Sequence, residues 1–190
     1  MYYTVQSEVT SKNTSVNSKK LPAIYNRLDW DALREHWVKI TKFEHPPIVL
    51  DFGCGRYTDH IEHFLATKGF IFRGYDPFWK SVEENNIALS SGLCYDPYIV
   101  ICSNVLNVIK DDIILNELQS KIRNFSFSVG LDKKQSLYYI SIYIGRGDGI
   151  GKITKEDCYQ RNQKINEYKL SSDYIRKNTI TSKTGKDFLI

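Results

Sequence analysis

The chain has 190 residues, which is enough for one domain with a sizeable core. Hydrophobic residues make up 42% and charged residues 25% of it, and these proportions exclude a disordered, collagen-like or repeat protein. The net charge of +4 arises within residues 152–190, where nine Lys and Arg face five Asp and Glu. Such a segment fits contacts with phosphate, or else a solvated lysine-rich surface.

The apolar runs and the cysteines indicate the setting of the protein. No apolar run approaches the ~20 residues needed to span a bilayer, and the start MYYTVQSEVTSK has no apolar leader. Cys54, Cys94, Cys102 and Cys158 form no Cys-x-x-Cys pair, so we expect reduced thiols and no metal site. The sequence therefore predicts a cytoplasmic protein that does not contact a membrane.

Residues 1–20 are polar, rich in Ser, Thr, Asn and Lys, and predict a flexible N-terminal arm. Residues 21–190 are expected to form a single domain. Asp29 can cap a helix, because apolar residues recur behind it at helical spacing: Trp30, Leu33, Trp37 and Ile40. The segment 45–47, His-Pro-Pro, ends that helix.

Strand and helix patterns then alternate along the chain. The predicted strands are 48–50, 70–75, 98–102 and 137–144, and the predicted helices are 59–68, 83–89 and 111–122. This alternation indicates an α/β protein with a Rossmann-like, mainly parallel sheet. Further along, the sequence predicts a glycine-rich loop at 145–151, a helix at 155–167, and a closing C-terminal hairpin of 179–182 with 186–190.

The ends of the predicted strands carry the chemistry. The first strand leads into Asp51-x-Gly53-x-Gly55, and the second ends at Asp76, 25 positions beyond Asp51. Glycines allow a tight turn and close approach of a ligand, and the helix that follows offers free N–H groups. An acid after the second strand is typical of a residue that binds ribose hydroxyls. We therefore expect a ligand that contains a nucleoside.

Two ligand classes fit this pattern, and the sequence favours one. A dinucleotide site commonly has Gly-x-Gly-x-x-Gly, but the third position here is Thr58. Asp51 would repel a pyrophosphate and would suit the ammonium group of a methionine. The pattern therefore favours S-adenosylmethionine as the cofactor.

Three segments give the chain a resemblance to a known family: IVLDFGCG at 48–55, GYDP at 74–77 and ICSNVLNVI at 101–109. They resemble motifs of class I S-adenosylmethionine-dependent methyltransferases, and most closely those of small, mostly uncharacterised members encoded by phages and bacteria. Thr14-Ser15, the segment 20–23 and the Tyr-Gln-x-Asn segment 159–162 extend this resemblance over most of the chain.

The resemblance implies a cofactor site and a fold of the class I methyltransferase type. It places the methionine moiety on the first loop, the ribose on the acid after the second strand, and the sulfonium methyl at the end of the third strand. The implied cofactor-binding residues are Asp51, Gly53, Cys54, Gly55, Asp76, Pro77, Ser103 and Asn104. The sequence departs from the family at Tyr57, where a third glycine is usual, and lacks a clear strand before Tyr98. Asp96 is either the residue that contacts adenine or a turn residue.

The methyl acceptor is less well defined. The motif Asp/Asn-Pro-Pro-Tyr/Phe, which marks amino-methylating enzymes of nucleic acids, is absent at 103–106. The catalytic candidates are Asn104, Asn107, Asp148 and Tyr159; Tyr143, Arg146, Gln160 and Asn162 are expected nearby, with the glycine-rich loop as a lid or a simple connection. We expect His60 and His63 to face solvent.

The function predicted is methyl transfer from S-adenosylmethionine to an acceptor, with nucleic acid or a nucleotide as one class of acceptor. A protein that binds the cofactor without transferring its methyl group, and a small-molecule methyltransferase, are the alternatives. The sequence leaves the oligomeric state open.

Overall fold

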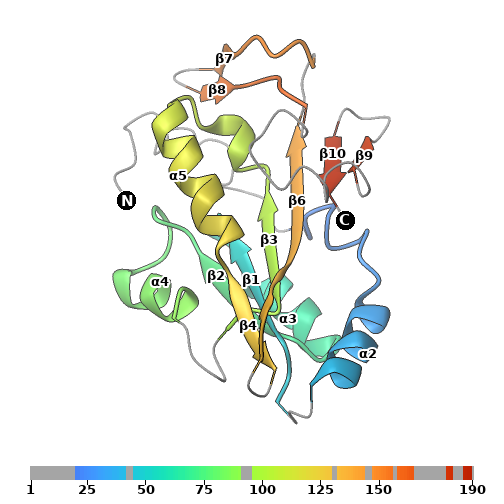
Figure 1. Ribbon diagram of the computed structural model, residues 1–190. Helices are drawn as coiled ribbons and strands as arrows, with labels where there is room; N and C mark the ends of the chain where they lie inside the picture. The colour runs from blue at the N-terminus through green and yellow to red at the C-terminus, as the bar shows by residue number, and fades with distance from the viewer. Residues whose placement is uncertain are drawn as a thin grey trace.

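A computed structural model gives the architecture of the chain (Figure 1). It describes residues 20–41, 45–90, 96–129, 132–143, 147–155, 158–164, 179–181 and 186–189. The predicted arm at 1–20 lies outside this part except for its last residue. No helix in the described ranges is long and apolar enough to cross a membrane.

A six-stranded sheet in the order β2-β1-β3-β6-β10-β9 forms the centre of the fold. Its strands are β1 (Ile48–Phe52), β2 (Ile71–Tyr75), β3 (Ile99–Ser103), β6 (Leu137–Tyr143), β9 (Thr179–Thr181) and β10 (Lys186–Leu189). The first four are parallel, β10 is antiparallel to β6, and β9 is antiparallel to β10. The α/β class, the mainly parallel sheet and the C-terminal hairpin are confirmed.

Helices lie on both faces of this sheet (Figure 1). They are α2 (Trp30–Ile40), α3 (Asp59–Thr67), α4 (Val82–Ala88) and α5 (Asp112–Arg123), with a 3-10 turn η1 (Leu106–Val108). Apolar side chains of α4 and α5 form one core with one face of the sheet. Side chains of α2, α3 and residues 21–28 form a second core on the other face.

The strand sequences explain why both faces are covered. In β3, Val100 and Cys102 belong to the core under α5, whereas Ile99 and Ile101 belong to the core under α2 and α3. Successive side chains of a strand point to opposite faces. A strand that is apolar at every position therefore needs a helical layer on each side, as parallel sheets require.

Two hairpins outside the main sheet differ from the predicted elements. Strands β4 (Ser126–Val129) and β5 (Asp132–Gln135) pair with each other and were not predicted. Strands β7 (Lys152–Lys155) and β8 (Cys158–Gln160) form a second antiparallel pair, with an irregularity after Ile153. The predicted helix at 155–167 is therefore wrong over its described residues, since the chain after β8 has no regular structure up to residue 164.

The chain order creates a switch point at β1. From β1 the chain moves to β2 on one side, and then to β3 on the other side of β1. The carboxyl ends of all three strands meet at one edge of the sheet, which is the upper edge in Figure 1. Ligands of open α/β sheets bind at this kind of edge.

Candidate functional site

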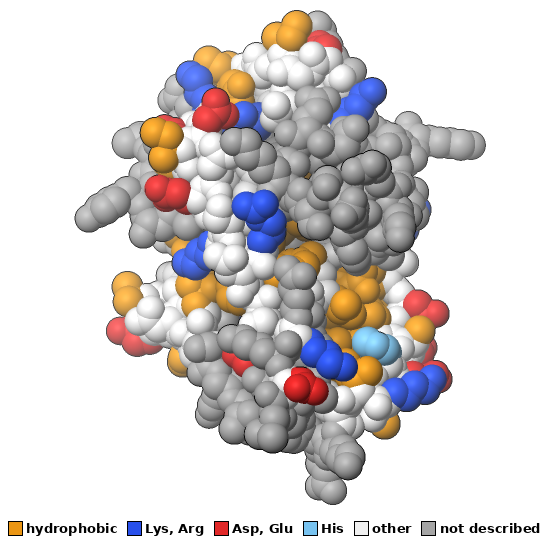
Figure 2. Space-filling model, viewed as in Figure 1, with side chains coloured by type: hydrophobic (Ala, Val, Ile, Leu, Met, Phe, Trp, Pro, Cys, Tyr) orange, Lys and Arg blue, Asp and Glu red, His pale blue; other side chains and the backbone are white. Residues whose placement is uncertain are grey.

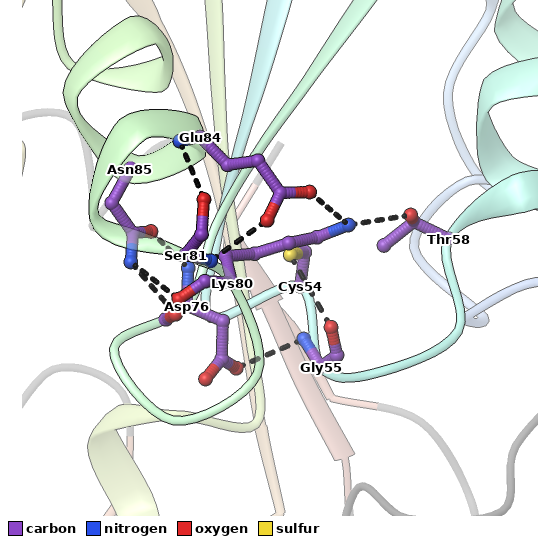
Figure 3. Close-up of polar contacts among 8 residues, drawn as sticks. All are labelled: Cys54, Gly55, Thr58, Asp76, Lys80, Ser81, Glu84 and Asn85. Carbon is purple, nitrogen blue, oxygen red and sulfur yellow. Dashed lines mark hydrogen bonds and ion pairs between the residues drawn. The ribbon is translucent and has the colours of Figure 1, made fainter.

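The loop after β1 is tied residue by residue to the end of β2. The N–H groups of Gly53 and Cys54 both donate to the carbonyl oxygen of Tyr75, at 2.7 and 3.2 Å. The N–H group of Gly55 donates to Oδ2 of Asp76 at 3.0 Å (Figure 3). Three successive amides are thus fixed, and the loops after β1 and β2 form one unit.

Asp76, the residue expected to bind ribose, holds both loops with its carboxylate. Its Oδ1 accepts from the N–H group of Phe78 at 2.9 Å, and the residue is only 3% exposed. Burial raises the pKa of Asp76, while hydrogen bonds from Phe78, Gly55 and Trp79 and the charge of Lys80 act against that rise. A carboxylate has about four acceptor positions, so with these three backbone donors about one position remains for a further donor.

Lys80 and Asn85 complete the connection between the loops (Figure 3). The Nζ atom of Lys80 donates to Oγ1 of Thr58 at 3.1 Å and lies 3.6 Å from the carboxylate of Glu84. The Asn85 side chain bonds to both the N–H group and the carbonyl oxygen of Asp76, at 3.0 and 3.1 Å. Helix α4 therefore fixes the backbone of Asp76, and Lys80 fixes the start of α3.

An aromatic pair covers the same two loops at Arg56. The Arg56 guanidinium lies 5.4 Å from the ring centroids of both Tyr57 and Trp79. Tyr57 is the residue that replaces a glycine of the resembling family. Its bulk is accommodated by this stacking on an exposed cation, which again joins the loop after β1 to the loop after β2.

Asp51, near the end of β1, is a buried carboxylate with one hydrogen bond. Its Oδ2 accepts from the hydroxyl of Tyr25 at 2.7 Å, and its Oδ1 has no partner among the described residues. Burial raises the pKa of Asp51 to about 7; the Tyr25 hydrogen bond lowers it, and the charge of Asp76 raises it. The free oxygen suits a positively charged donor and would repel a phosphate.

Gly53 brings the end of β3 against the first loop. Its φ angle is +86°, and a Cβ at this position would lie 2.3 Å from Cγ2 of Val105. The conformation and the close approach both require glycine. The third predicted strand end is thereby brought into contact with the predicted cofactor loop.

The end of β3 carries polar groups at the same edge. The hydroxyls of Ser103 and Ser141 lie 2.8 Å apart across the β3–β6 pair. Asn104 has a φ angle of +58°, its N–H group donates to the carbonyl oxygen of Ser141 at 2.7 Å, and its side chain is exposed. A non-glycine residue held in the left-handed region next to a candidate site is consistent with a functional constraint.

The segment after β3 is joined to β8 by buried amide groups. Nδ2 of Asn107 donates to Oε1 of Gln160 at 3.1 Å, and both residues are less than a tenth exposed. Asn162 is 1% exposed, has a φ angle of +55°, and donates to the carbonyl oxygen of Ile150 at 2.7 Å. These buried contacts hold residues 161–162 in an irregular conformation, where the sequence predicts a helix at 155–167.

Arg161 anchors this segment more firmly than the amides do. Its guanidinium donates to the carbonyl oxygens of Ile109 and, at 2.7 Å, Lys110, and it lies 2.9 Å from the carboxylate of Asp112. The residue is 7% exposed. A buried guanidinium with carbonyl and carboxylate partners holds the β7–β8 pair above the carboxyl ends of β3 and β6 (Figure 1).

The remaining predicted residues lie around this hairpin. Asp148 is exposed, and its Oδ1 accepts from the N–H group of Ile150 at 3.0 Å within the glycine-rich loop. The Tyr159 hydroxyl fills the space beside Gly151, where a Cβ would lie 1.6 Å from it. Arg146 and the side chain of Tyr143 lie outside the described residues.

The predicted residues thus fall into two groups at one edge. The cofactor candidates Asp51, Gly53, Cys54, Gly55 and Asp76 are brought together, and Pro77 follows directly in the turn after β2. The acceptor candidates Asn107 and Tyr159 lie with Gln160 and Asn162 at the β7–β8 hairpin, whereas Asp96 is half-buried before β3.

Four residues of the site were not predicted, because their partners are distant in sequence: Tyr25, Lys80, Ser141 and Arg161. Tyr25 could have been found as a tyrosine inside an otherwise apolar segment, and Arg161 as an arginine between two amide residues. The other two lie at strand ends or loop positions with no distinguishing pattern.

No metal centre is found in the described part of the chain. It contains no group of three or more His, Cys, Asp and Glu residues that could hold an ion. Cys54 and Cys102 are free cysteines in the described part of the chain. His63 is exposed, whereas His60 is only half-exposed and its Nε2 is buried, so the expectation for the histidines holds only in part.

Comparison with known proteins adds no family name. No protein-family model matches the chain, and no curated protein matches it at a significant level.

The buried carboxyl group of Asp51 should make stability depend on pH. Its pKa of about 7 lies above the value near 4 of an unfolded aspartate, so the folded protein holds an extra proton between these values. The resulting stabilisation is present below pH 4 and is lost as the pH rises through 7. As the pH rises across this range, the unfolding free energy of the wild type, measured by urea denaturation, should fall by about 4 kcal/mol relative to that of Asp51→Asn, which has no carboxyl group at this position. A constant difference would contradict the assignment.

Gly53→Ala should destabilise the protein more than Gly69→Ala does. Both residues have positive φ angles, which cost about 1–2 kcal/mol for alanine. At Gly69 the nearest atom to a Cβ is the flexible Arg34 side chain at 3.2 Å, whereas Gly53 meets Val105. Overpacking should add about 1–3 kcal/mol at Gly53. When Val105→Ala is added to Gly53→Ala, urea denaturation should show recovery of the overpacking cost but not of the cost of the positive φ angle. Equal losses of unfolding free energy in Gly53→Ala and Gly69→Ala would refute the contact with Val105.

Proposed function

We propose that this protein is an S-adenosylmethionine-dependent methyltransferase of the class I type. The observation that carries the proposal is the meeting of three groups at the switch point of the sheet. These are the half-satisfied carboxylate of Asp51, the glycine loop at 53–55, and the carboxylate of Asp76. The sequence motifs that resemble this family lie at these positions.

The chemistry of the three groups matches the parts of this cofactor. The Oδ1 atom of Asp51, which has no partner among the residues that the structure describes, fits an ammonium group, because a buried acceptor without a donor is costly. Asp76 retains acceptor capacity for a hydroxyl group of a ribose. The buried carboxylate of Asp51 beside the first loop disfavours a dinucleotide, whose pyrophosphate would lie on that loop.

The start of α3 fits the remaining charged group, a carboxylate. Thr58 precedes the helix, but its side chain forms no capping bond and instead accepts from Lys80. The first N–H groups of α3 therefore lack a side-chain cap, and helix N-termini favour anions.

When bound, S-adenosylmethionine would supply an electrophilic methyl group on a sulfonium. The chain would contribute alignment, which can provide much of the rate enhancement of a displacement. Asn104 and the Ser103–Ser141 pair lie at the end of β3 and could orient a nucleophile by hydrogen bonds. Asn107 is buried and bonded to Gln160, so we assign it to support of the hairpin rather than to direct contact.

The β7–β8 hairpin is the proposed acceptor surface, with a nucleic acid as the acceptor. Lys110, Lys152 and Lys164 are exposed there, and Nζ of Lys110 lies 6.0 Å from the Tyr159 ring centroid. Figure 2 shows Lys and Arg side chains on both sides of this upper end of the molecule. Exposed cations beside an aromatic ring suit phosphates and stacked bases.

Calorimetric titration of S-adenosylmethionine and S-adenosylhomocysteine tests the cofactor assignment. The wild type should bind both ligands, and Asp76→Asn should bind them more weakly by about 1–3 kcal/mol, because a charged acceptor is lost. Since Asp76 also holds two loops, Asp29→Ala is the matched control. It removes the cap of α2 at a cost of about 1 kcal/mol, away from the site, and should bind normally. No binding by the wild type would refute the proposal.

Salt dependence tests the acceptor class. Binding of a single-stranded oligonucleotide, measured by fluorescence anisotropy, should weaken steeply as salt increases. Lys110→Gln and Lys152→Gln should each reduce the slope of log affinity against log salt by about 0.7, whereas Lys39→Gln on α2 should not. An affinity for the oligonucleotide that does not change with salt concentration would contradict a nucleic-acid acceptor and favour a small molecule.

A further inference from the structure

The hydrogen bond between Tyr25 and Asp51 connects two parts of the chain that are 26 residues apart. Tyr25 is 0% exposed and Asp51 is 2% exposed, so neither group gains a hydrogen bond from bulk water. A phenol and a carboxylate that are both removed from water are costly unless they are paired. The hydrogen bond of 2.7 Å between them therefore stabilises the end of β1.

Aromatic packing fixes the Tyr25 ring and so aims its hydroxyl. The ring stacks on Trp30 with centroids 5.8 Å apart, and Phe64 of α3 contacts it edge-on at 6.3 Å. The indole Nε1 of Trp30 also donates to the carbonyl oxygen of Tyr25 at 2.8 Å. Both the backbone and the ring of Tyr25 are thereby held, and the hydroxyl reaches only one oxygen of Asp51.

The other groups around Asp51 do not favour its ionised form. The charge of Asp76, after the end of β2, raises the pKa of Asp51, and Asp51 in turn raises the pKa of the Cys54 and Cys102 thiols. The Cys102 side chain belongs to the core on the other face of the sheet. Lys80 acts on Cys54 and Asp76. Among the described groups that act on Asp51, Tyr25 is the one that stabilises the negative charge.

We propose that Tyr25 is a positioning residue of the cofactor site: its hydroxyl holds Asp51 as a carboxylate, with Oδ1 left for the ammonium group of the bound amino-acid moiety. This inference rests on the proposed function for the identity of the ligand. It assigns residues 21–28, which precede the sheet, to the cofactor site.

The consequence is ligand binding that depends on pH through Asp51. Its pKa of about 7 in the free protein means that a proton competes with the ligand's ammonium near neutral pH. Below this pKa the affinity should fall up to tenfold for each pH unit. Without the Tyr25 hydroxyl, the ionised form loses its hydrogen bond, and the same fall should begin at a higher pH.

Calorimetric titration of S-adenosylhomocysteine between pH 6 and 8.5 tests this inference. In Tyr25→Phe, the midpoint of the affinity profile should move upward by at least one pH unit. Affinity at pH 7 should fall at least about fivefold, because the ionised fraction falls with the shift of the midpoint, and it should recover as the pH rises. Titration of the ligand's own amino group is common to both proteins, so it cancels in their ratio.

Two controls separate positioning from packing. Tyr98→Phe removes another buried tyrosine hydroxyl, one that bonds to His36 at 2.7 Å away from Asp51, and should leave the profile unchanged. The probe 5′-methylthioadenosine lacks the amino-acid moiety, so its affinity should not change between wild type and Tyr25→Phe. Equal weakening of both probes by Tyr25→Phe would indicate a structural role and overturn the inference.

A second measurement does not depend on ligand binding. With aspartate carboxyl carbons labelled with ¹³C, the Asp51 signal, assigned by its absence in Asp51→Asn, should titrate near pH 7 in the wild type. It should titrate higher in Tyr25→Phe. An Asp51 signal that titrates near pH 4 in the wild type, or equally in both proteins, would overturn the inference. Absence of ligand binding at every pH would refute the proposed function, while this titration would still decide the role of Tyr25.

Discussion

Two carboxylates buried at neighbouring strand ends, Asp51 and Asp76, set the requirements for the rest of this edge. Removing charge from water is costly: burial raises the pKa of both carboxyl groups, and the charge of Asp76 raises that of Asp51 further. The cost of burial is offset at Asp76 by hydrogen bonds from backbone amides and by the charge of Lys80, and at Asp51 by one hydrogen bond from the Tyr25 hydroxyl. The glycine loop, the turn after β2 and residues 21–28 are all fixed by these partners.

The difference between the two carboxylates is informative. Asp76 is bonded on both oxygens and joins two loops, so its first role is to shape the edge. Among the described residues, Asp51 is bonded on one oxygen only, by the hydroxyl of Tyr25. A fold that needed Asp51 only for stability would gain from a neutral residue there. Its retention of an unpaired oxygen is therefore better explained by a ligand than by folding.

Periodicity in the sequence was sufficient to predict the sheet and its helices. Strand β3 is apolar at every position before its last residue, Ser103, and α5 carries Ile114, Leu115 and Leu118 on one side, so both patterns are unambiguous. The β7–β8 hairpin was mistaken for a helix because its strands are short, polar and interrupted by an irregularity. Its stability comes from Arg161, whose partners lie about 50 residues earlier and leave no local pattern.

The place of the candidate site could be predicted from the sequence, whereas its hydrogen bonds could not. Strand ends of a parallel sheet must meet, so Asp51, the glycine loop and Asp76 could be placed together from spacing alone. Which oxygen is bonded, and by what, depends on contacts between distant segments, such as that of Tyr25 with Asp51. Such contacts follow from packing of the whole core and not from any window of sequence.

The distribution of charge at this edge gives the two groups of residues different tasks. The cofactor group presents buried carboxylates, which attract an ammonium and repel phosphate, whereas the hairpin presents exposed lysines. A nucleic acid drawn to the hairpin would be kept out of the cofactor group by the same carboxylates that favour the cofactor. Arg161 fixes the hairpin to the segment that follows β3, so the buried carboxylates and the exposed lysines are held at a constant separation. The ligands of these two groups of residues would meet at the end of β3, beside Asn104.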